Sequence, residues 1–539
     1  MNPIIFQYNA RRSMGVARRG MVSTSNPLAA GAGLNILRMG GNAADAAVAA
    51  AAVLAVTEPA STGLGGDCFA LYFDAQSKQI SALNGSGRAP MGLTLDWMRA
   101  QGFSHIPVHS PHAVSVPGTV AGWADLLARH GRMSLRETLA EAAYHAREGY
   151  PVHPVFAASW ARVESFLKQG HHTEAYLPGG RAPKAGEVVR LPELARTLDQ
   201  IAAEGPAAFY EGQTAQAIVE TLQALGGLMD LGDLKAHRST WETPISTNYR
   251  GVQVFECPPN GQGLAALQAL NIVEGWPVTE QAWDSPERLH LMIEAMRLAF
   301  ADARHYVADN TTNPAPLEFL LSKTYAAERR AQVTPGRAMQ PPSFGVPPAS
   351  SDTVYLTTVD QAGNACSFIN SLYMGFGSGI VAKGTGVFLQ NRGALFELDP
   401  THPNALAPGK RPYHTIIPGM ATRDGELYAS FGVMGGYMQP QGHLQVISAL
   451  VDDDLDPQSA LNRPRFCLLE GSGDSVVALE DGIPLATMAR LAEWGHTVRP
   501  VSGQGRGVFG SGDIIRRDPH SGVLFGGCDP RKDGIVVGF

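Results

Sequence analysis

Common nucleophile and cofactor motifs are missing from the sequence. The chain contains no G-x-S-x-G elbow, no H-E-x-x-H and no G-x-x-x-x-G-K-[ST], so a serine elbow, a zincin helix and a phosphate loop all lose support. A G-x-G-x-x-G string occurs at Gly505, Gly507 and Gly510. The strand-like run 511–517 follows it, whereas a dinucleotide site needs a helix there. We therefore expect no nucleotide cofactor.

The spacing of histidines and cysteines does not indicate a metal site. Three histidines fall within eight residues of a proline-containing loop, without a carboxylate or cysteine at ligand spacing: His105, His109 and His112. The five cysteines lie far apart, with no C-x-x-C pair and an odd total: Cys68, Cys257, Cys366, Cys467 and Cys528. We expect no metal, no disulfide framework and a reducing compartment.

The junction between Asp352 and Thr353 is more informative. Residues 334–352 hold five prolines in 19 positions and no helical or alternating pattern, which predicts a surface linker. Immediately afterwards, 353–359 and 365–373 read as strands separated by turn residues, which predicts a β-hairpin. Taken alone, Thr353 would be an ordinary β-branched strand residue.

Several long strings give this junction a context. In chain order they are MVSTSNPLAAGAGLNILRMGGNAADAAVAAAAVLAVTEPASTGLGGD, LNGSGRAP, SDTVYLTTVDQAGNACSFINS, GFGSGIV, GKRPYHTIIP, FGVMGGYMQPQGH and DPRKDGIVVGF. With these strings the chain resembles the γ-glutamyltransferase (γ-glutamyltranspeptidase) family of N-terminal-nucleophile hydrolases, from about Gly20 to the end.

This resemblance implies an α/β fold, a four-layer αββα sandwich, and a precursor that cuts itself between Asp352 and Thr353. The products would be a large chain, 1–352, and a small chain, 353–539, which stay associated as one domain. In the cut, the Thr353 hydroxyl attacks the Asp352 carbonyl, an N-to-O acyl shift gives an ester, and water hydrolyses it. The freed α-amine has an ordinary pKa of about 7.7 to 8.0, so Thr353 can be both nucleophile and general base.

The family also implies roles for other residues. Gly435 and Gly436, after an expected strand at 427–432, match the pair whose backbone N–H groups stabilise the oxyanion. Arg88 matches the arginine that holds the substrate carboxylate. Ser371 aligns with a hydroxyl residue that assists the nucleophile. An ordinary turn, a structural ion pair and a solvent-facing strand serine are the respective alternatives.

Departures from the family bear on the substrate. Leu395, in LQNRGALFEL, stands where glutathione-cleaving members have an acidic residue for the γ-glutamyl ammonium. An unpaired charged donor in a closed site costs about 2 to 3 kcal/mol, which would make a poor γ-glutamyl site. Tyr373 replaces an asparagine of those members, and His414 with Thr415 replaces a pair of serines. The segment 395–414 is also short where some relatives carry a lid.

A substrate with a carboxylate but no α-amine is therefore favoured. The oxamate amidohydrolase branch of the family, which belongs to purine catabolism, has these properties, so we expect hydrolysis of oxamate to oxalate and ammonia. The alternatives are a γ-glutamyltransferase or glutathione hydrolase acting on γ-glutamyl amides, an enzyme for other small-acyl or β-lactam side-chain amides, and a non-catalytic scaffold. The transferase-to-hydrolase balance and a dimer of processed pairs stay open.

Capping residues predict where several of the helices that support the proposed catalytic residues begin. Asn26-Pro27 opens a helix that runs to Met39, and Asn42 caps a second, alanine-rich helix with Asp45 in its first turn. Ser134 and Glu137 form a capping box before a third. Further helices are expected at about 193–204, 213–225, 285–304 and 485–495, and further strands at 21–25, 68–73, 385–390 and 513–516.

Composition limits the partners. The chain has 539 residues, with 42 Lys and Arg against 49 Asp and Glu, and a net charge of −7 would repel a phosphate backbone. With 44% hydrophobic and 17% charged residues it is not disordered. The first 20 residues lack a secretory apolar region, and the most apolar stretch, 43–56, is shorter than the ~20 residues needed to cross a bilayer. We expect a cytoplasmic protein without nucleic-acid or membrane partners.

Overall fold

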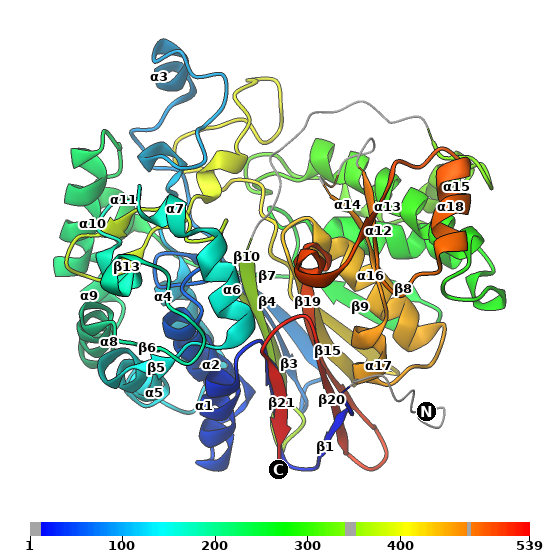
Figure 1. The fold of residues 1–539 in the computed structure, drawn as a ribbon, viewed down its shortest axis with the longest axis horizontal. Helices are drawn as coiled ribbons and strands as arrows, with labels where there is room; N and C mark the ends of the chain where they lie inside the picture. The colour runs from blue at the N-terminus through cyan, green and yellow to red at the C-terminus, as the bar shows by residue number, and fades with distance from the viewer. Residues whose placement is uncertain (1–11, 340–351, 470, 472–475) are drawn as a thin grey trace.

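The computed structural model describes residues 12–339, 352–469, 471 and 476–539 (Figure 1). Most of the predicted linker, 340–351, lies outside the described residues. Two seven-stranded sheets occupy the centre, and the strands of both pair antiparallel.

The strand orders of the two sheets are as follows. The first sheet runs β1 (Gly15–Ala17), β20 (Leu524–Cys528), β19 (Ser511–Arg517), β15 (Glu426–Met434), β14 (Gly419–Arg423), β9 (Val252–Glu256) and β8 (Ile245–Tyr249). The second runs β21 (Ile535–Gly538), β2 (Met21–Thr24), β10 (Asp352–Val359), β11 (Ala365–Tyr373), β3 (Asp67–Asp74), β4 (Gln79–Gly85) and β7 (Thr240–Glu242). Smaller sheets join β5 (Tyr150–Pro151) with β6 (Val188–Val189), β12 (Val381–Ala382) with β13 (Val387–Phe388), and β16 (Phe466–Leu468), β17 (Val477–Glu480) and β18 (Val498–Val501).

Helices lie on both sides of the paired sheets (Figure 1). On the side of the second sheet are α1 (Pro27–Arg38), α2 (Ala43–Thr57), α3 (Leu95–Ala100), α4 (Thr119–His130), α5 (Leu135–Glu148), α6 (Pro154–Arg162), α7 (Glu164–Leu167), α8 (Pro192–Glu204), α9 (Ala207–Tyr210), α10 (Gln213–Ala224) and α11 (Leu231–Ala236). On the side of the first sheet are α12 (Gly263–Glu274), α13 (Pro286–Tyr306), α14 (Leu317–Leu320), α15 (Lys323–Arg330), α16 (Met438–Val451), α17 (Pro457–Asn462) and α18 (Leu485–Glu493).

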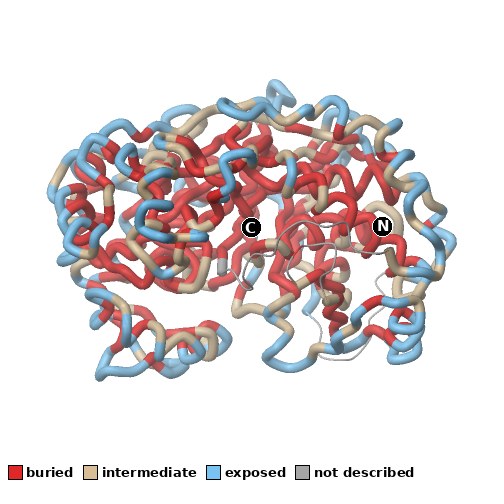
Figure 2. The backbone as a smooth tube through the Cα atoms, turned by 90° about the horizontal axis from the view of Figure 1, so that it is seen from above, coloured by how far each residue is buried: buried red, intermediate tan, exposed pale blue. Residues whose placement is uncertain are grey.

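Three apolar layers hold this stack together, and Figure 2 shows the buried backbone filling its interior. Side chains alternate along β10: Val354 and Leu356 pack against the helices that include α2, and Tyr355 packs between the sheets, as the period of two in a strand requires. A third cluster joins the other face of the first sheet to α12, α13 and α16. These layers confirm the predicted αββα sandwich.

The predicted caps form as expected. The Asn42 side chain accepts from the backbone N–H of Asp45 (3.2 Å), and the Asp45 carboxylate accepts from that of Asn42 (2.8 Å), which completes a capping box. All 15 residues of α2 are buried, because its alanines let neighbouring helices and strands approach closely. Ser134 and Glu137 cap α5 in the same way.

Most predicted elements agree with the structure to within a few residues, although several elements of the structure, among them α4, α12 and α16, were not predicted. The expected strand at 385–390 shortens to Val387–Phe388. In α16, Pro440 and Gly442 are residues that disfavour a helix interior. Pro440 falls in the first turn, where a missing N–H is tolerated. Gly442 faces Val433 of β15 so closely that an added Cβ would lie 2.5 Å from its side chain.

No helix in the described segments combines the length and apolar character that crossing a bilayer requires.

Candidate active site

Thr353 and Ser371 meet at the start of the β10–β11 hairpin. Thr353 Oγ1 lies 3.2 Å from Ser371 Oγ, and both residues are buried. The pairing register shifts between Asp352 and Val354, so Thr353 sits at an irregularity of the ladder, a device that re-aims a side chain. The structure thus places the predicted nucleophile in hydroxyl contact with its predicted helper.

Gly435 and Gly436 follow the end of β15, a strand that crosses β10 from the facing sheet. Thr357 Oγ1 donates to Ser430 Oγ (2.6 Å). Tyr355 lies two residues before Thr357 on β10, and Gly432 lies two residues after Ser430 on β15. The Tyr355 ring covers Gly432, where an added Cβ would lie 2.4 Å from the ring. Beyond these contacts, β10 begins at Asp352 and β15 ends at Met434, the residue before Gly435.

The backbone of the glycine pair is suited to presenting amides. Both residues have positive φ, 120° at Gly435 and 59° at Gly436. Within the described part of the chain neither amide nitrogen donates a hydrogen bond, although both carbonyls accept from the first turn of α16. The 14-residue helix therefore begins directly after the pair, and its N-terminal dipole adds positive potential there.

Asp67, at the start of β3, ties the loops around this point together. Its carboxylate accepts from the Gly87 amide (2.9 Å), Gln390 Nε2 (2.8 Å) and His414 Nε2 (3.0 Å). Burial raises the pKa of Asp67 to about 6, against the opposing charge of Arg392. The loops that carry Arg88, Arg392 and Thr415 are thus fixed to one buried group, which the sequence alone did not single out.

His414 and Thr415, predicted to line the substrate pocket, are both buried and hydrogen-bonded to neighbouring segments. Both ring nitrogens of His414 are occupied, Nε2 by Asp67 and Nδ1 by the Ile416 amide (3.3 Å). Burial lowers the pKa of His414 well below its usual value, so the ring is neutral and supports the loop. Thr415 Oγ1 instead accepts from Arg392 Nη1 (2.7 Å).

Arg392 is the charged residue that the sequence interpretation overlooked. It lies in the quoted segment LQNRGALFEL and is completely buried. Its guanidinium lies over the Tyr373 ring, 4.6 Å from the centroid, and Tyr373 adopts a positive φ of 81°. Such a conformation costs a non-glycine residue about 1 to 3 kcal/mol and clusters at functional sites. Its position three residues before Leu395, in the segment already singled out, was the available signal.

Leu395, the apolar residue at the position where glutathione-cleaving members have an acidic one, is buried. Leu395 is 8% exposed and belongs to the apolar cluster that contains Tyr373 and Tyr413. An apolar side chain there offers an ammonium group no counter-ion, as the sequence indicated.

Arg88, the predicted carboxylate-binding residue, lies on the loop after β4. Its Nη1 donates to the Arg238 carbonyl (3.2 Å), the side chain is partly exposed, and no carboxylate of the described residues pairs with it. The buried Arg411 lies close enough for the charge of Arg88 to lower its pKa, which burial brings down to about 10. The structure does not bring Arg88 into contact with Thr353.

A second polar cluster lies on the other side of the molecule. His290, Glu294 and His496 are buried, with potential ligand atoms within 4.8 Å of one another. His290 Nδ1 and His496 Nε2 share a hydrogen bond (2.8 Å), and Arg297 Nε lies 3.5 Å from Glu294 Oε1, where it would oppose a cation. We interpret the cluster as a polar contact that holds α13 against the segment after α18.

The histidines of the 105–112 loop do not converge. The His109 ring packs on Phe166, with centroids 4.2 Å apart, and the His112 ring on Trp97 at 4.9 Å.

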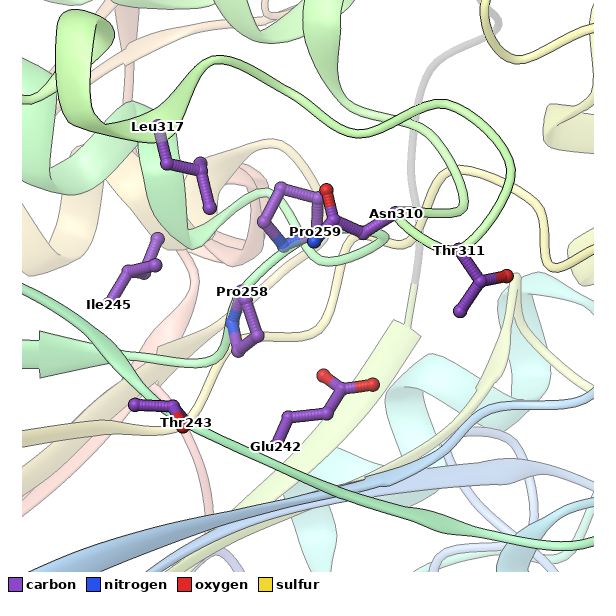
Figure 3. A pocket seen from close by; sticks show the side chains of 8 residues that line it. All are labelled: Glu242, Thr243, Ile245, Pro258, Pro259, Asn310, Thr311 and Leu317. Carbon is purple, nitrogen blue, oxygen red and sulfur yellow. The ribbon is translucent and has the colours of Figure 1, made fainter.

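A cavity of about 330 Å³ lies beside the site (Figure 3). Figure 3 shows its lining: Glu242, Thr243, Ile245, Pro258, Pro259, Asn310, Thr311 and Leu317. None of these is a predicted site residue. Burial raises the pKa of the Glu242 carboxyl. The cavity therefore lacks the nucleophile and the glycine pair, and we assign it no chemistry.

Comparison with known proteins agrees with this geometry. A family model described as Gamma-glutamyltranspeptidase matches residues 29–539. The chain is 39% identical to the Glutathione hydrolase-like YwrD proenzyme of Bacillus subtilis, covering 97% of this chain and 99% of that protein. It is 35% identical to the Oxamate amidohydrolase proenzyme of Klebsiella pneumoniae, covering 98% and 100%.

A solved structure, a cephalosporin acylase from Bacillus halodurans, superposes with a TM-score of 0.92 at 45% identity, over 100% of this chain and 99% of that one. The superposition covers the whole chain and therefore all layers of the sandwich. On these grounds the chain belongs to the gamma-glutamyltranspeptidase family of amide-cleaving N-terminal-nucleophile hydrolases.

Proposed function

We propose that the protein is a self-processing N-terminal-threonine amidohydrolase that acts on a small carboxylate-bearing amide, with oxamate as the favoured substrate. The observation that carries the proposal is the 3.2 Å contact between Thr353 Oγ1 and Ser371 Oγ at the head of β10. Relatives described as proenzymes, among them one named for oxamate, support it.

In the processing step, Thr353 Oγ1 attacks the carbonyl carbon of Asp352 and the C–N bond breaks. The resulting ester is hydrolysed by water, which leaves chains 1–352 and 353–539. The step releases the α-amine of Thr353, the base that the hydroxyl needs.

In the hydrolytic step, the amine takes the hydroxyl proton while Oγ1 attacks the amide carbon of the substrate. The amides of Gly435 and Gly436 stabilise the oxyanion, and Ser371 positions the hydroxyl. The proton passes to the leaving nitrogen, ammonia departs, and water attacks the acyl ester under the same amine base. By resemblance to the family, Arg88 binds the substrate carboxylate. Tyr373 and Thr415 line the substrate site beside the nucleophile.

The pH dependence tests the amine as base. We expect kcat/KM to rise with pH through an apparent pKa of about 7 to 8, because an unperturbed α-amine loses its proton there. Steady-state rates between pH 5 and 9 measure this. A rate that does not change over that range would contradict the role of the amine.

A substrate panel tests the acyl group. Ammonia release from oxamate should exceed the buffer blank by far, and hydrolysis of glutathione or a γ-glutamyl anilide should be slower, because Leu395 offers the ammonium no partner. An enzyme that cleaves the γ-glutamyl anilide well and oxamate no faster than buffer would instead be a glutathione hydrolase, as the Bacillus subtilis relative's name suggests for that protein.

A further inference from the structure

Resting on the proposed function, we propose that Arg392 binds the substrate carboxylate beside the scissile amide and so selects anionic acyl groups. Arg392 thereby replaces Arg88 as the main determinant of substrate charge.

The first observation is a buried cation with two donor nitrogens that lack a hydrogen-bond partner. Arg392 is 0% exposed, and its Nε and Nη2 have no hydrogen-bond partner. The charge of Asp67 acts on Arg392, but no hydrogen bond joins the two, and the Asp67 carboxylate accepts instead from Gln390 and His414. Other fully buried arginines are paired: Arg288 Nη2 with Asp453 (2.8 Å), and Arg465 Nη2 with Asp529 (2.8 Å). Buried donors left without a hydrogen-bond partner are costly, so the free Nε and Nη2 of Arg392 are suited to an anion that arrives from outside.

The second observation is the place of this cation. On one side, the Tyr373 ring lies under the guanidinium, and the Tyr373 amide donates to Ser371 Oγ (2.8 Å), which contacts Thr353. On the other side, Arg392 donates to Thr415, whose carbonyl accepts from Gln262 Nε2 (2.6 Å).

Gln262 Nε2 also donates to the carbonyl of Gly436 (2.9 Å). Contacts through Tyr373 and Ser371 therefore connect Arg392 to Thr353, and contacts through Thr415 and Gln262 connect it to Gly436.

The third observation is the shape of the free edge. Nη1 is used by Thr415, which leaves Nε and Nη2, two neighbouring donors on one edge of a planar group. Two parallel N–H donors match the two oxygens of a carboxylate. Arg88 offers a weaker case, since it is partly exposed and already donates to a carbonyl.

These observations define a substrate class: amides whose acyl part carries a carboxylate close to the reacting carbonyl and no ammonium. Burial lowers the pKa of Arg392 to about 10, so it is positively charged at neutral pH. It would repel an α-ammonium and attract the carboxylate of oxamate, which is bonded directly to the amide carbon.

The test compares charged and neutral isosteres on the processed enzyme. Oxamide has the shape of oxamate without its charge. The ratio of kcat/KM for oxamate over oxamide should fall about 10- to 150-fold in Arg392→Gln, the range for one charged hydrogen-bonded pair, and much less in Arg88→Gln. Calorimetric titration with oxalate should show a matching loss of affinity in Arg392→Gln, and Arg392→Lys should recover part of it.

The outcomes separate the two proposals. If Arg392→Gln processes itself and melts like the wild type, yet keeps the wild-type ratio and oxalate affinity, the inference is wrong; a loss confined to Arg88→Gln also overturns it. If the wild type binds oxalate through Arg392 but releases no ammonia from oxamate, the proposed function fails while the inference stands. Should Arg392→Gln not fold, Arg392→Lys decides: wild-type oxalate affinity together with a wild-type oxamate-to-oxamide ratio in that variant would overturn the inference, and a partial loss of both would support it.

Discussion

Replacing Thr353 by alanine is expected to leave the chain whole at 57.2 kDa and to lower amide hydrolysis by about 10⁴- to 10⁶-fold. The alanine has no oxygen to attack Asp352 or the substrate, and without the cut no α-amine is released. The wild type should instead give bands of about 37 and 20 kDa, because 57.2 kDa divides in the ratio 352 to 187. A denaturing gel and an ammonia assay measure the two effects.

Thr353→Ser is the matched control, since it keeps a hydroxyl on the same backbone. It should still process and retain measurable hydrolysis. An alanine variant that splits into the same two bands, or a wild-type small chain whose first residues are not Thr-Val-Tyr, would contradict the assignment of Thr353.

Gly435→Ala is expected to lower kcat by about 10²- to 10³-fold, the effect of losing one oxyanion donor. At φ 120° an alanine is strained, and its Cβ would lie 3.1 Å from the Gly510 Cα. The peptide must rotate to relieve this, which turns the amide away from the developing charge. Steady-state and burst kinetics on the processed variant measure the loss.

Gly384→Ala controls for backbone strain alone. Gly384 is exposed and has a positive φ of 75°, with nothing within 4 Å of an added Cβ. It should lose about 1 kcal/mol of stability and no activity. Equal kcat values in Gly435→Ala and the wild type would remove the glycine pair from the mechanism.

Local signals accounted for much of the fold. Two helix starts could be predicted because a capping box needs only residues three positions apart: Asn42 with Asp45, and Ser134 with Glu137. The hairpin that carries Thr353 is equally local. The helix α16 could not be predicted in this way, because its Pro440 and Gly442 are tolerated for reasons that depend on a first-turn position and on β15.

In the active site, too, contacts within one local element could be predicted and contacts between separate segments could not. Thr353 and Ser371 could be placed together from one hairpin. The roles of Asp67 and Gln262 depend on contacts between segments 323 and 174 residues apart, and that of Arg392 on a contact with Thr415 in another loop, 23 residues away. Periodicity and caps carry no information about such contacts. His414 illustrates the limit, since its position near the site was expected but its bond to Asp67 was not.

The strand order has a consequence for the cut molecule. In the second sheet β21, β10 and β11 come from the proposed small chain, and β2, β3, β4 and β7 come from the large chain. In the first sheet four small-chain strands lie between β1 and β9. Separating the two fragments would therefore break backbone hydrogen bonds in both sheets. We expect the processed enzyme to unfold in one cooperative transition. An affinity tag on either fragment should retain the other until denaturant is added.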